Sequence, residues 1–435
     1  MRSVLSCAVI VCGAITLCTP CKLRAQDSEK NATDPELADL LHTPGTLVSY
    51  LDGVPRVTVQ GPACGSGAGT GGYVFQLQYL NRVTAEAYGA VTKEDAGFNW
   101  KVSTAVLRHW PDGNLHLEIG KTAVCFRRVE GADHWVEVGG WGRTIRLVEE
   151  DGYACHVIET RKKGLSFFHA DGALAQKFHK AVDAEGHSWH FLYYGAGDGK
   201  YSYKLKALYI PQQAWFWQFY YYSDSGFLRE IRVCRGIRVE DVLELRYYTG
   251  LYEGIGSPGD LQSVLRRRWD AETSSWRERL TVFRYYTAHE ERGRPHDLKY
   301  VIGPDACAGI TTRYEGRRIE LLEDALIDDP DAADPVALYD AYFEYHVMPG
   351  DPELDGCVRL FLLRNRLSEF TCKGHAVGAY SYQWQAYGQP GSSVTMPYKD
   401  AMRRLREGHP DGTERIIEIN RGGLVTAARK VVGEP

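Results

Sequence analysis

Apolar and polar residues alternate over short stretches along most of the chain, and turn residues separate these stretches. Leu115 to Ile119 and Trp135 to Val138 show the two-residue period of half-buried strands. Pro111 to Asn114, Gly139 to Gly140 and Asp151 to Gly152 are typical turn sequences between such strands. The pattern therefore predicts a succession of β-hairpins.

Helical periodicity is sparse. The best candidate is the amphipathic stretch from Tyr398 to Leu405, which is two turns long, and a short helix is also expected around Asp34 to Leu41. We therefore expect very little helix.

A longer pattern recurs along the chain. The tetrapeptide Arg-Tyr-Tyr-Thr occurs at 246–249 and again at 284–287, and Asp-Leu-x-x-Val follows each copy, at 260–264 and 297–301. Each copy is predicted to form a strand, a polar loop containing glycine, and a second strand. The residues that define the two copies are Arg246, Tyr247, Tyr248, Asp260, Leu261, Arg284, Tyr285, Tyr286, Asp297 and Leu298.

A shorter pattern, with an aromatic residue, a glycine four positions later and a leucine six positions later, occurs at 168–174 and at 222–228. It predicts a hairpin in which the glycine takes positive φ and the leucine starts the return strand. Because one hairpin cannot bury its own face, such units have to stack. The defining residues are Phe168, Asp171, Gly172, Leu174, Tyr222, Gly226 and Leu228.

These units resemble the RHS/YD-repeat family, whose repeats look like Tyr-Asp-x-x-Gly-Arg-Leu followed by a short strand. The resemblance covers roughly residues 150–435, and 222–228 is the closest match. Ser223 stands where the family has aspartate, and Phe227 and Ala173 stand where it has arginine. The family's closing core segment, with its Asp-Pro-x-Gly-Leu type of ending, is not found. The resemblance implies a spiralling β-sheet that builds a hollow shell for cargo enclosure, adhesion or cell-surface contact.

The first 25 residues have the pattern of a secretion signal. Arg2 precedes an apolar run from Val4 to Leu17, and Ala25 offers a small residue for cleavage. The run of roughly 15 residues is short of the ~20 that a membrane span needs. We therefore expect a secreted, periplasmic or cell-surface protein with no membrane contact beyond this signal.

Composition agrees with short strands and turns, with 27 tyrosines and 45 glycines. The net charge is −5, so no large positive field points to nucleic acid. Seven cysteines remain after the signal, with long spacings, so the disulfide state stays open and a zinc cluster is not expected.

The whole pattern predicts an all-β fold in which repeated β-hairpins stack into an open curved sheet or solenoid-like shell. The expected organisation is a signal peptide (1–25), a polar linker (26–60), an N-terminal β region (61–160) and the YD-like repeats (161–435).

Few residues suggest chemistry. Trp215, Trp217 and Phe219 share one strand face, which could stack on sugars or pack in a core, and we favour packing. His187 and His190 would point to opposite faces of a strand, which argues against a metal pair.

Two further motifs carry no site. The acidic stretch 328–334 lacks the alternating acids and central glycine of a calcium loop, and the Gly-x-Gly-x-x-Gly at 67–72 precedes a strand rather than a helix. Arg266 to Arg268 is predicted to lie in a solvated loop or at a strand edge. We therefore expect no cofactor, no metal and no catalytic residue.

The sequence thus predicts an exported structural or surface interaction module, and not an enzyme. A protein partner, or the rest of a shell, is expected to bind it, and nucleic acid is not. Two alternatives stay open. One is a secreted carbohydrate-binding or carbohydrate-cleaving β protein, and the other is the leading part of a larger toxin- or cargo-enclosing shell.

Overall fold

The computed structural model confirms the predicted all-β fold. Within the residues that it describes, the chain forms β-strands and one short 3-10 helix, η3 (Gly199–Tyr201), and no α-helix. None of these residues belongs to a helix long and apolar enough to span a membrane. The described residues are 57–63, 74–79, 93–102, 105–110, 113–119, 122–138, 143–159, 164–183, 185–211, 214–287, 294–302, 309–315, 318–326, 336–345, 358–365, 378–387, 402–420 and 425–431.

One large sheet runs from β6 to β29, and each strand pairs antiparallel with the next one along the chain. Its first strands are β6 (Val106–His109), β7 (Leu115–Ile119), β8 (Thr122–Arg128), β9 (His134–Glu137), β10 (Thr144–Glu150), β11 (Tyr153–Glu159), β12 (Leu165–His169) and β13 (Phe178–Val182). The middle strands are β14 (Ser188–Tyr193), β15 (Leu205–Ile210), β16 (Trp215–Tyr221), β17 (Leu228–Arg235), β18 (Arg238–Tyr247), β19 (Leu261–Asp270), β20 (Ser275–Tyr285) and β21 (Leu298–Ile302). The last are β22 (Gly309–Glu315), β23 (Arg318–Leu326), β24 (Val336–Tyr345), β25 (Val358–Asn365), β26 (Gly378–Tyr387), β27 (Met402–Gly408), β28 (Glu414–Asn420) and β29 (Val425–Val431).

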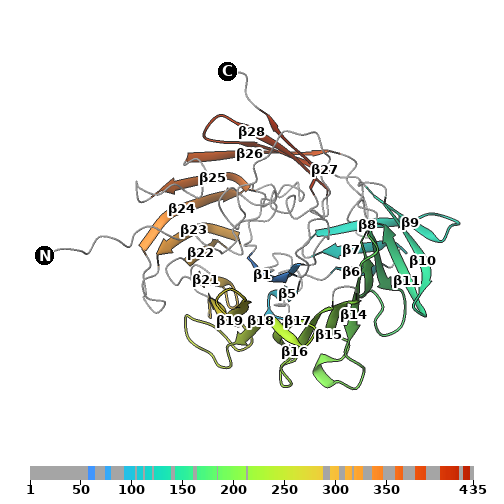
Figure 1. Cartoon of the computed structure of the whole chain (residues 1–435). Coiled ribbons are helices and arrows are strands. Elements are labelled where there is room, and N and C mark those ends of the chain that lie inside the picture. The colour runs from blue at the N-terminus through green and yellow to red at the C-terminus, as the bar shows by residue number, and fades with distance from the viewer. Residues whose placement is uncertain are drawn as a thin grey trace.

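The large sheet curves through almost a full turn, so that its last strands come back toward its first ones (Figure 1). In the described part of the chain no residue register pairs β29 with β6, and the sheet is an open, curved one. The predicted stack of hairpins is therefore confirmed. The helix expected up to Leu405 is wrong from Met402 onward, because these residues pair with β26 and β28 as part of β27.

A second, three-stranded sheet lies inside the curve. It consists of β1 (Thr58–Ala63), β2 (Val74–Tyr79) and β5 (Trp100–Val102), in the order β1-β2-β5. A small hairpin of β3 (Lys93–Glu94) and β4 (Gly97–Phe98) precedes β5. We call β1-β2-β5 the inner sheet, and Figure 1 shows it enclosed by the strands of the large sheet.

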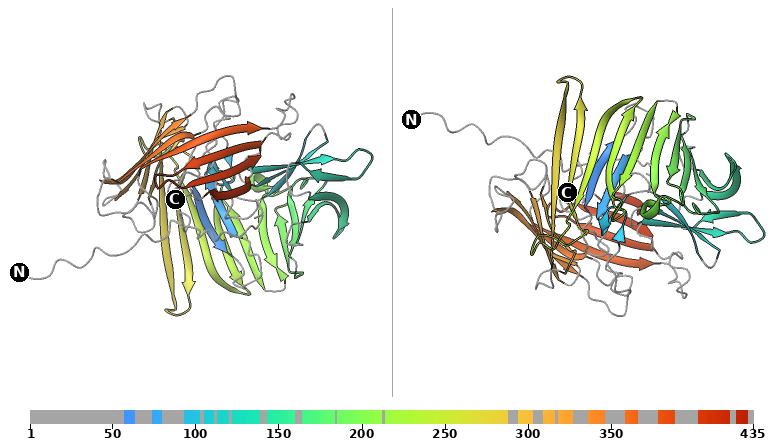
Figure 2. Two further views of the ribbon diagram at one scale, coloured as in Figure 1. Left: turned by 90° about the horizontal axis from the view of Figure 1, so that it is seen from above. Right: turned by 90° about the horizontal axis from the view of Figure 1, so that it is seen from below.

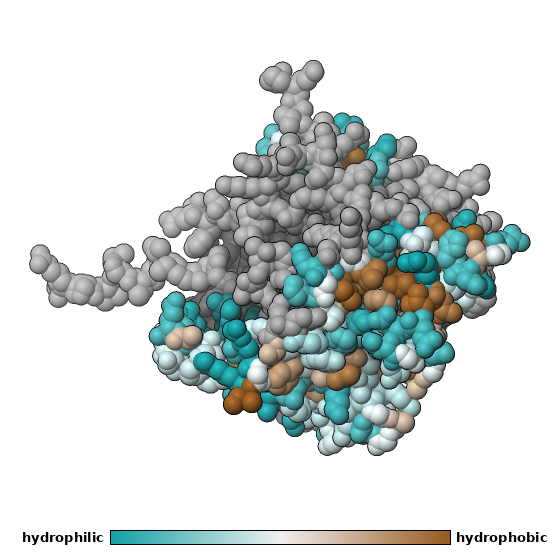
Figure 3. Space-filling model, turned by 45° about the vertical axis from the view of Figure 1, so that its right-hand side comes forward, coloured by the Kyte–Doolittle hydropathy of each residue, from teal (hydrophilic) through white to brown (hydrophobic). Residues whose placement is uncertain are grey.

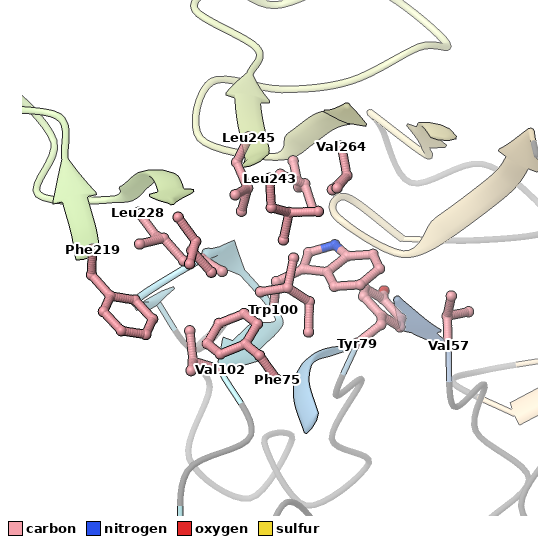
Figure 4. Packing of buried hydrophobic residues seen from close by; sticks show 14 of the residues in the cluster. Val57, Phe75, Tyr79, Trp100, Val102, Phe219, Leu228, Leu243, Leu245 and Val264 are labelled. Atoms are coloured by element: carbon pink, nitrogen blue, oxygen red, sulfur yellow. The ribbon is translucent and has the colours of Figure 1, made fainter. Parts of the chain in front are cut away.

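The inner sheet and the concave face of the large sheet form the main core. Trp100, Phe75 and Tyr79 of the inner sheet are fully buried and pack against side chains from β16 to β21 (Figure 4). Trp100 lies 4.7 Å from Phe283 between ring centroids. Burying rings of this size is the main source of stability for such a joint, at roughly 25 cal/mol per Å² of apolar surface.

The start of the large sheet folds into a lobe with its own core. The backbone N–H of Leu107 in β6 donates to the carbonyl of Gln176 at 3.0 Å, and Val106 forms a β-bridge with Lys177. The strands between them therefore enclose a separate apolar cluster. This cluster consists of Leu107, Leu115, Leu117, Val124, Phe126, Trp135, Ile145, Ile158 and Phe168.

Pairs of tyrosines at one end of the middle strands repeat with the hairpins. The first tyrosine of each pair follows a bulge in the register and lies opposite an apolar residue of the next strand. The four pairings are Tyr193↔Leu205, Tyr221↔Leu228, Tyr247↔Leu261 and Tyr285↔Leu298.

The side-chain hydroxyl of the first tyrosine of a pair bonds to the backbone of the preceding hairpin. The Tyr247 hydroxyl donates to the carbonyl of Leu228, the residue that lies opposite the preceding tyrosine, at 2.7 Å. Equivalent bonds join Tyr193 to Phe178 at 2.7 Å, Tyr221 to Leu205 at 2.9 Å and Tyr285 to Leu261 at 2.9 Å.

The side-chain hydroxyl of the second tyrosine of a pair bonds to the backbone of the following hairpin. The Tyr248 hydroxyl donates to the carbonyl of Phe283, two residues before Tyr285, at 2.9 Å. Equivalent bonds join Tyr194 to Phe219 at 2.9 Å and Tyr222 to Leu245 at 3.2 Å. The pairs at 193–194, 221–222 and 247–248 thus tie their own hairpins to the hairpins on both sides. We call these bonds, together with the backward bond of Tyr285, the tyrosine ladder.

Candidate functional site

The aromatic face of β16 lies under the inner sheet. Trp217 and Phe219 are each only 1% exposed, whereas Trp215 is half-buried. The ring of Phe75 in β2 packs edge-on to Trp217 with centroids 6.5 Å apart, and it lies 5.6 Å from Phe219. The side chains that a sugar would stack on are therefore packed inside the core.

The duplicated Arg-Tyr-Tyr-Thr and Asp-Leu-x-x-Val segments take equivalent positions in the fold. Each tetrapeptide ends a strand, β18 or β20, and each Asp-Leu begins the next, β19 or β21. The carboxylate of Asp260 accepts the backbone N–H of Ser257 at 2.9 Å, and that of Asp297 accepts the N–H of Arg294 at 3.0 Å. Both aspartates are buried, so the repeat residues shape the loops and the tyrosine ladder.

The two copies of the shorter pattern differ by one position. Phe168 lies opposite Phe178 after a bulge, which is the position of Tyr221 and not of Tyr222. Leu228 begins β17, whereas Leu174 lies in the turn before β13. The remaining members of the pattern are turn residues: Asp171 is exposed, and Gly172 and Gly226 have φ of 69° and 72°.

The structure gives His187 and His190 separate partners. The Nδ1 atom of His187 lies 3.0 Å from Asp183 Oδ2, whereas His190 stacks on Tyr209 and contacts Ser188 Oγ at 2.9 Å. Asp183, Glu185 and His187 do place ligand-type atoms within 4.8 Å of one another.

The Asp183 carboxylate is already occupied within this turn. It accepts the backbone N–H groups of Glu185 and His187 at 3.0 and 2.8 Å. Burial alone would raise the pKa of Asp183, but these bonds and the His187 ring lower it below its usual value. These bonds therefore close the β13–β14 turn.

Two buried histidines near the first lobe resist protonation. Burial and the neighbouring His109, whose Nε2 atom lies 3.2 Å from that of His156, lower the pKa of His156 to about 4. Burial, followed by the charge of His179, lowers the pKa of His169 to about 4.

We expect the protein to lose stability in mild acid. Between pH 6.5 and 4 the unfolded chain binds protons on these two histidines that the folded chain does not bind, so acid favours unfolding. For His156 the loss is on the order of 2 kcal/mol at pH 5. Urea titrations at pH 7 and pH 5 measure it. A His156→Gln variant should show a smaller difference between the two pH values, and equal differences in both proteins would contradict the assignment.

One hairpin of the described sheet projects beyond the strands on both sides of it. The long hairpin of β19 and β20 extends past the ends of its neighbours (yellow in Figure 2), and its residues Ser275 to Leu280 are all exposed. We call its outer half, 265–280, the projecting hairpin.

The convex side of the projecting hairpin carries an exposed aromatic and apolar group. Trp269 lies directly opposite Trp276, with ring centroids 5.6 Å apart, and Leu265 lies opposite Leu280. The guanidinium of Arg238 lies over the Trp269 ring at 5.0 Å and holds it in place. Trp276 and Leu280 remain 41% and 45% exposed, so this group is available to a partner.

Other apolar residues are exposed elsewhere on the surface. The face in Figure 3 shows one larger hydrophobic patch and several smaller ones among hydrophilic residues. The other large examples are Leu147, Tyr153, Leu192, Ile237, Leu251 and Tyr252. Sequence reasoning missed this group on the hairpin. Both tryptophans are visible in the sequence, but only the strand register shows that they lie opposite each other.

Several earlier expectations concern residues outside the described ranges. These are the signal (1–25), most of the linker (26–60), the glycine-rich motif at 67–72 and the acidic stretch 328–334. The described cysteines Cys155 and Cys234 are buried free thiols.

Comparison with known proteins finds weak structural similarity and no sequence match. No family model and no curated protein matches the chain. Among solved structures, the N-terminal domain of the effector protein SpvB from Salmonella typhimurium aligns with 60% of this chain and 99% of its own, at 11% identity and a TM-score of 0.27.

Two further solved structures show similarly weak likeness. The TcdB2-TccC3-TEV structure aligns with 85% of this chain and 27% of its own, at 8% identity and a TM-score of 0.18. A porin-like protein from Bacteroides uniformis aligns with 70% of this chain and 93% of its own, at 8% identity and a TM-score of 0.23.

Proposed function

We propose that this chain is an exported structural module of the RHS/YD type, which presents the projecting hairpin to a protein partner. The observation that carries the proposal is the exposed Trp276–Leu280 group on a hairpin that stands clear of the sheet. Exposed tryptophans packed beside arginines are typical of the residues that dominate protein interfaces. The proposal involves no catalytic step and no cofactor.

The arrangement of the core supports a structural role. The concave face between β16 and β21, where a curved sheet would hold a small ligand, is filled by the inner sheet. The tyrosine ladder ties successive hairpins together and so maintains the curvature. The carbohydrate-binding alternative depended on Trp215, Trp217 and Phe219, two of which are buried, and we do not propose it.

Capture of binding proteins by the immobilised full chain tests the proposal. The native organism's secreted and surface proteins are passed over the wild type and over a Trp276→Ala/Leu280→Ala variant. We expect a partner whose retention falls at least about 10-fold in the variant, as for a truncated interface centre.

A Leu192→Ala variant is the matched control, because Leu192, at 47%, has an exposure similar to that of Leu280 and lies on β14, which pairs with β13 and β15 and not with the strands of the projecting hairpin. Circular dichroism should show the same unfolding midpoint for all three proteins. A partner retained equally by all three, or lost equally from both variants, would overturn the proposal.

A further inference from the structure

Four arginines form a two-by-two array on the concave side of the projecting hairpin. Arg266 lies directly opposite Arg279, and Arg268 directly opposite Arg277. Residues at alternate positions of a strand share one face. Since Val264 on this face is buried in the main core, the array continues the concave face outward past the core.

Only half of this positive charge is neutralised by the protein itself. Arg266 pairs with Asp241 of β18, with two nitrogens at 3.2 and 2.7 Å, and Arg277 pairs with Asp270. Arg268 and Arg279 are exposed, and no described carboxylate forms an ion pair with either of them.

Such an array works against the stability of the hairpin. Like charges directly opposite each other in an antiparallel pair are destabilising, and here two successive pairs are alike. On the convex side of the same hairpin, in contrast, Arg267 lies opposite Glu278 and also contacts Glu244. The concave side therefore carries positive charge that does not stabilise the fold.

The spacing of the array suits an extended acidic chain. Arg268 and Arg279 are diagonal neighbours across β19 and β20, and such residues are about 7–8 Å apart. Acidic side chains at alternate positions of an extended peptide are about 6.7 Å apart, so two of them can reach both arginines. The arginine fork binds a carboxylate through two parallel hydrogen bonds. Nucleic acids, in contrast, bind by neutralisation of many phosphates, which two uncompensated arginines cannot supply.

We propose that the concave side of the projecting hairpin binds an extended acidic peptide segment, with Asp or Glu at alternate positions, through Arg268 and Arg279. The inference extends the proposed function, because it assigns a second surface of the same hairpin and a chemistry to the segment that it binds.

Fluorescence anisotropy with the full chain tests the inference. The probe is a labelled ten-residue peptide of alternating Glu and Thr, and a heparin oligosaccharide and a ten-nucleotide single-stranded DNA are tested beside it. We expect saturable binding of the peptide that falls about 10-fold or more in Arg268→Gln/Arg279→Gln and weakens with added salt. The oligosaccharide and the DNA should bind more weakly than the peptide.

Two controls separate binding from folding. Arg267→Gln changes the same strand on its convex side and should bind the peptide like the wild type. The double variant should unfold at the same or a higher urea concentration than the wild type, because its substitutions remove like-charge contacts.

Absence of saturable peptide binding, equal binding by all variants, or tighter binding of the oligosaccharide or the DNA would each overturn the inference. The test is independent of partner capture. If the peptide fails to bind while capture still depends on Trp276 and Leu280, only this inference fails. If the peptide binds while capture does not depend on those residues, only the proposed function fails.

Discussion

Trp217→Ala lowers the free energy of unfolding by about 3–5 kcal/mol, the range for truncation of a large buried ring. Trp217 is 1% exposed and packs against Phe75 of the inner sheet, so the substitution leaves a cavity between the two sheets. Urea unfolding followed by far-UV circular dichroism measures the loss.

Trp276→Ala is the control for Trp217→Ala, because it removes the same side chain from an exposed position and should cost less than about 1 kcal/mol. A Trp217→Ala protein as stable as the wild type would mean that the ring is not enclosed between the sheets. It would also reopen the aromatic face of β16 as a surface for ligands.

Tyr285→Phe is expected to lower the free energy of unfolding by about 2–4 kcal/mol, because it leaves two buried groups without their partner. The Tyr285 hydroxyl accepts the Trp100 Nε1–H at 2.7 Å and donates to the carbonyl of Leu261 at 2.9 Å. It therefore joins the inner sheet to the tyrosine ladder. Thermal and urea unfolding of the variant measure the loss.

Tyr247→Phe gives the matched comparison for Tyr285→Phe. Its hydroxyl makes the same ladder bond, to the carbonyl of Leu228, but no bond to the inner sheet is found for it among the described residues. We expect about 1–2 kcal/mol for this single bond. Equal losses in the two variants would show that the Trp100 bond adds nothing.

The sequence predicted much of the fold because its signals are local. Alternation over five to ten residues indicates a strand, and glycine with Asp or Ser indicates the turn that follows it. The duplicated Arg-Tyr-Tyr-Thr segment correctly located two consecutive ends of hairpins. The shorter aromatic-to-leucine pattern located two more, with one of them displaced by a residue.

The inner sheet could not be predicted from local pattern. Tyr79 donates to the carbonyl of His296 and accepts the backbone N–H of Leu298, residues more than 200 positions away. Nothing near Tyr79 in the sequence indicates those partners. Packing was favoured over sugar stacking for Trp217, but its partner Phe75 could not be identified from the sequence for the same reason.

The two faces of the projecting hairpin depend on register. The expectation of a solvated loop or strand edge for Arg266 to Arg268 is wrong, because these residues lie within β19 and pair with both β18 and β20. Only the pairing with β20 shows that Arg267 lies on one side while Arg266 and Arg268 lie on the other, opposite two more arginines. A shift of one residue would have exchanged the two faces.

The central claim is that the inner sheet is an integral part of the curved sheet's core. Hydrogen exchange of the full chain, measured peptide by peptide, tests it most directly. We predict that the amides of β2 and β5 are protected to the same degree as those of β16 to β18, and that Trp217→Ala lowers the protection of both groups together. Fast exchange in β2 and β5 beside slow exchange in β16 to β18 would contradict the claim.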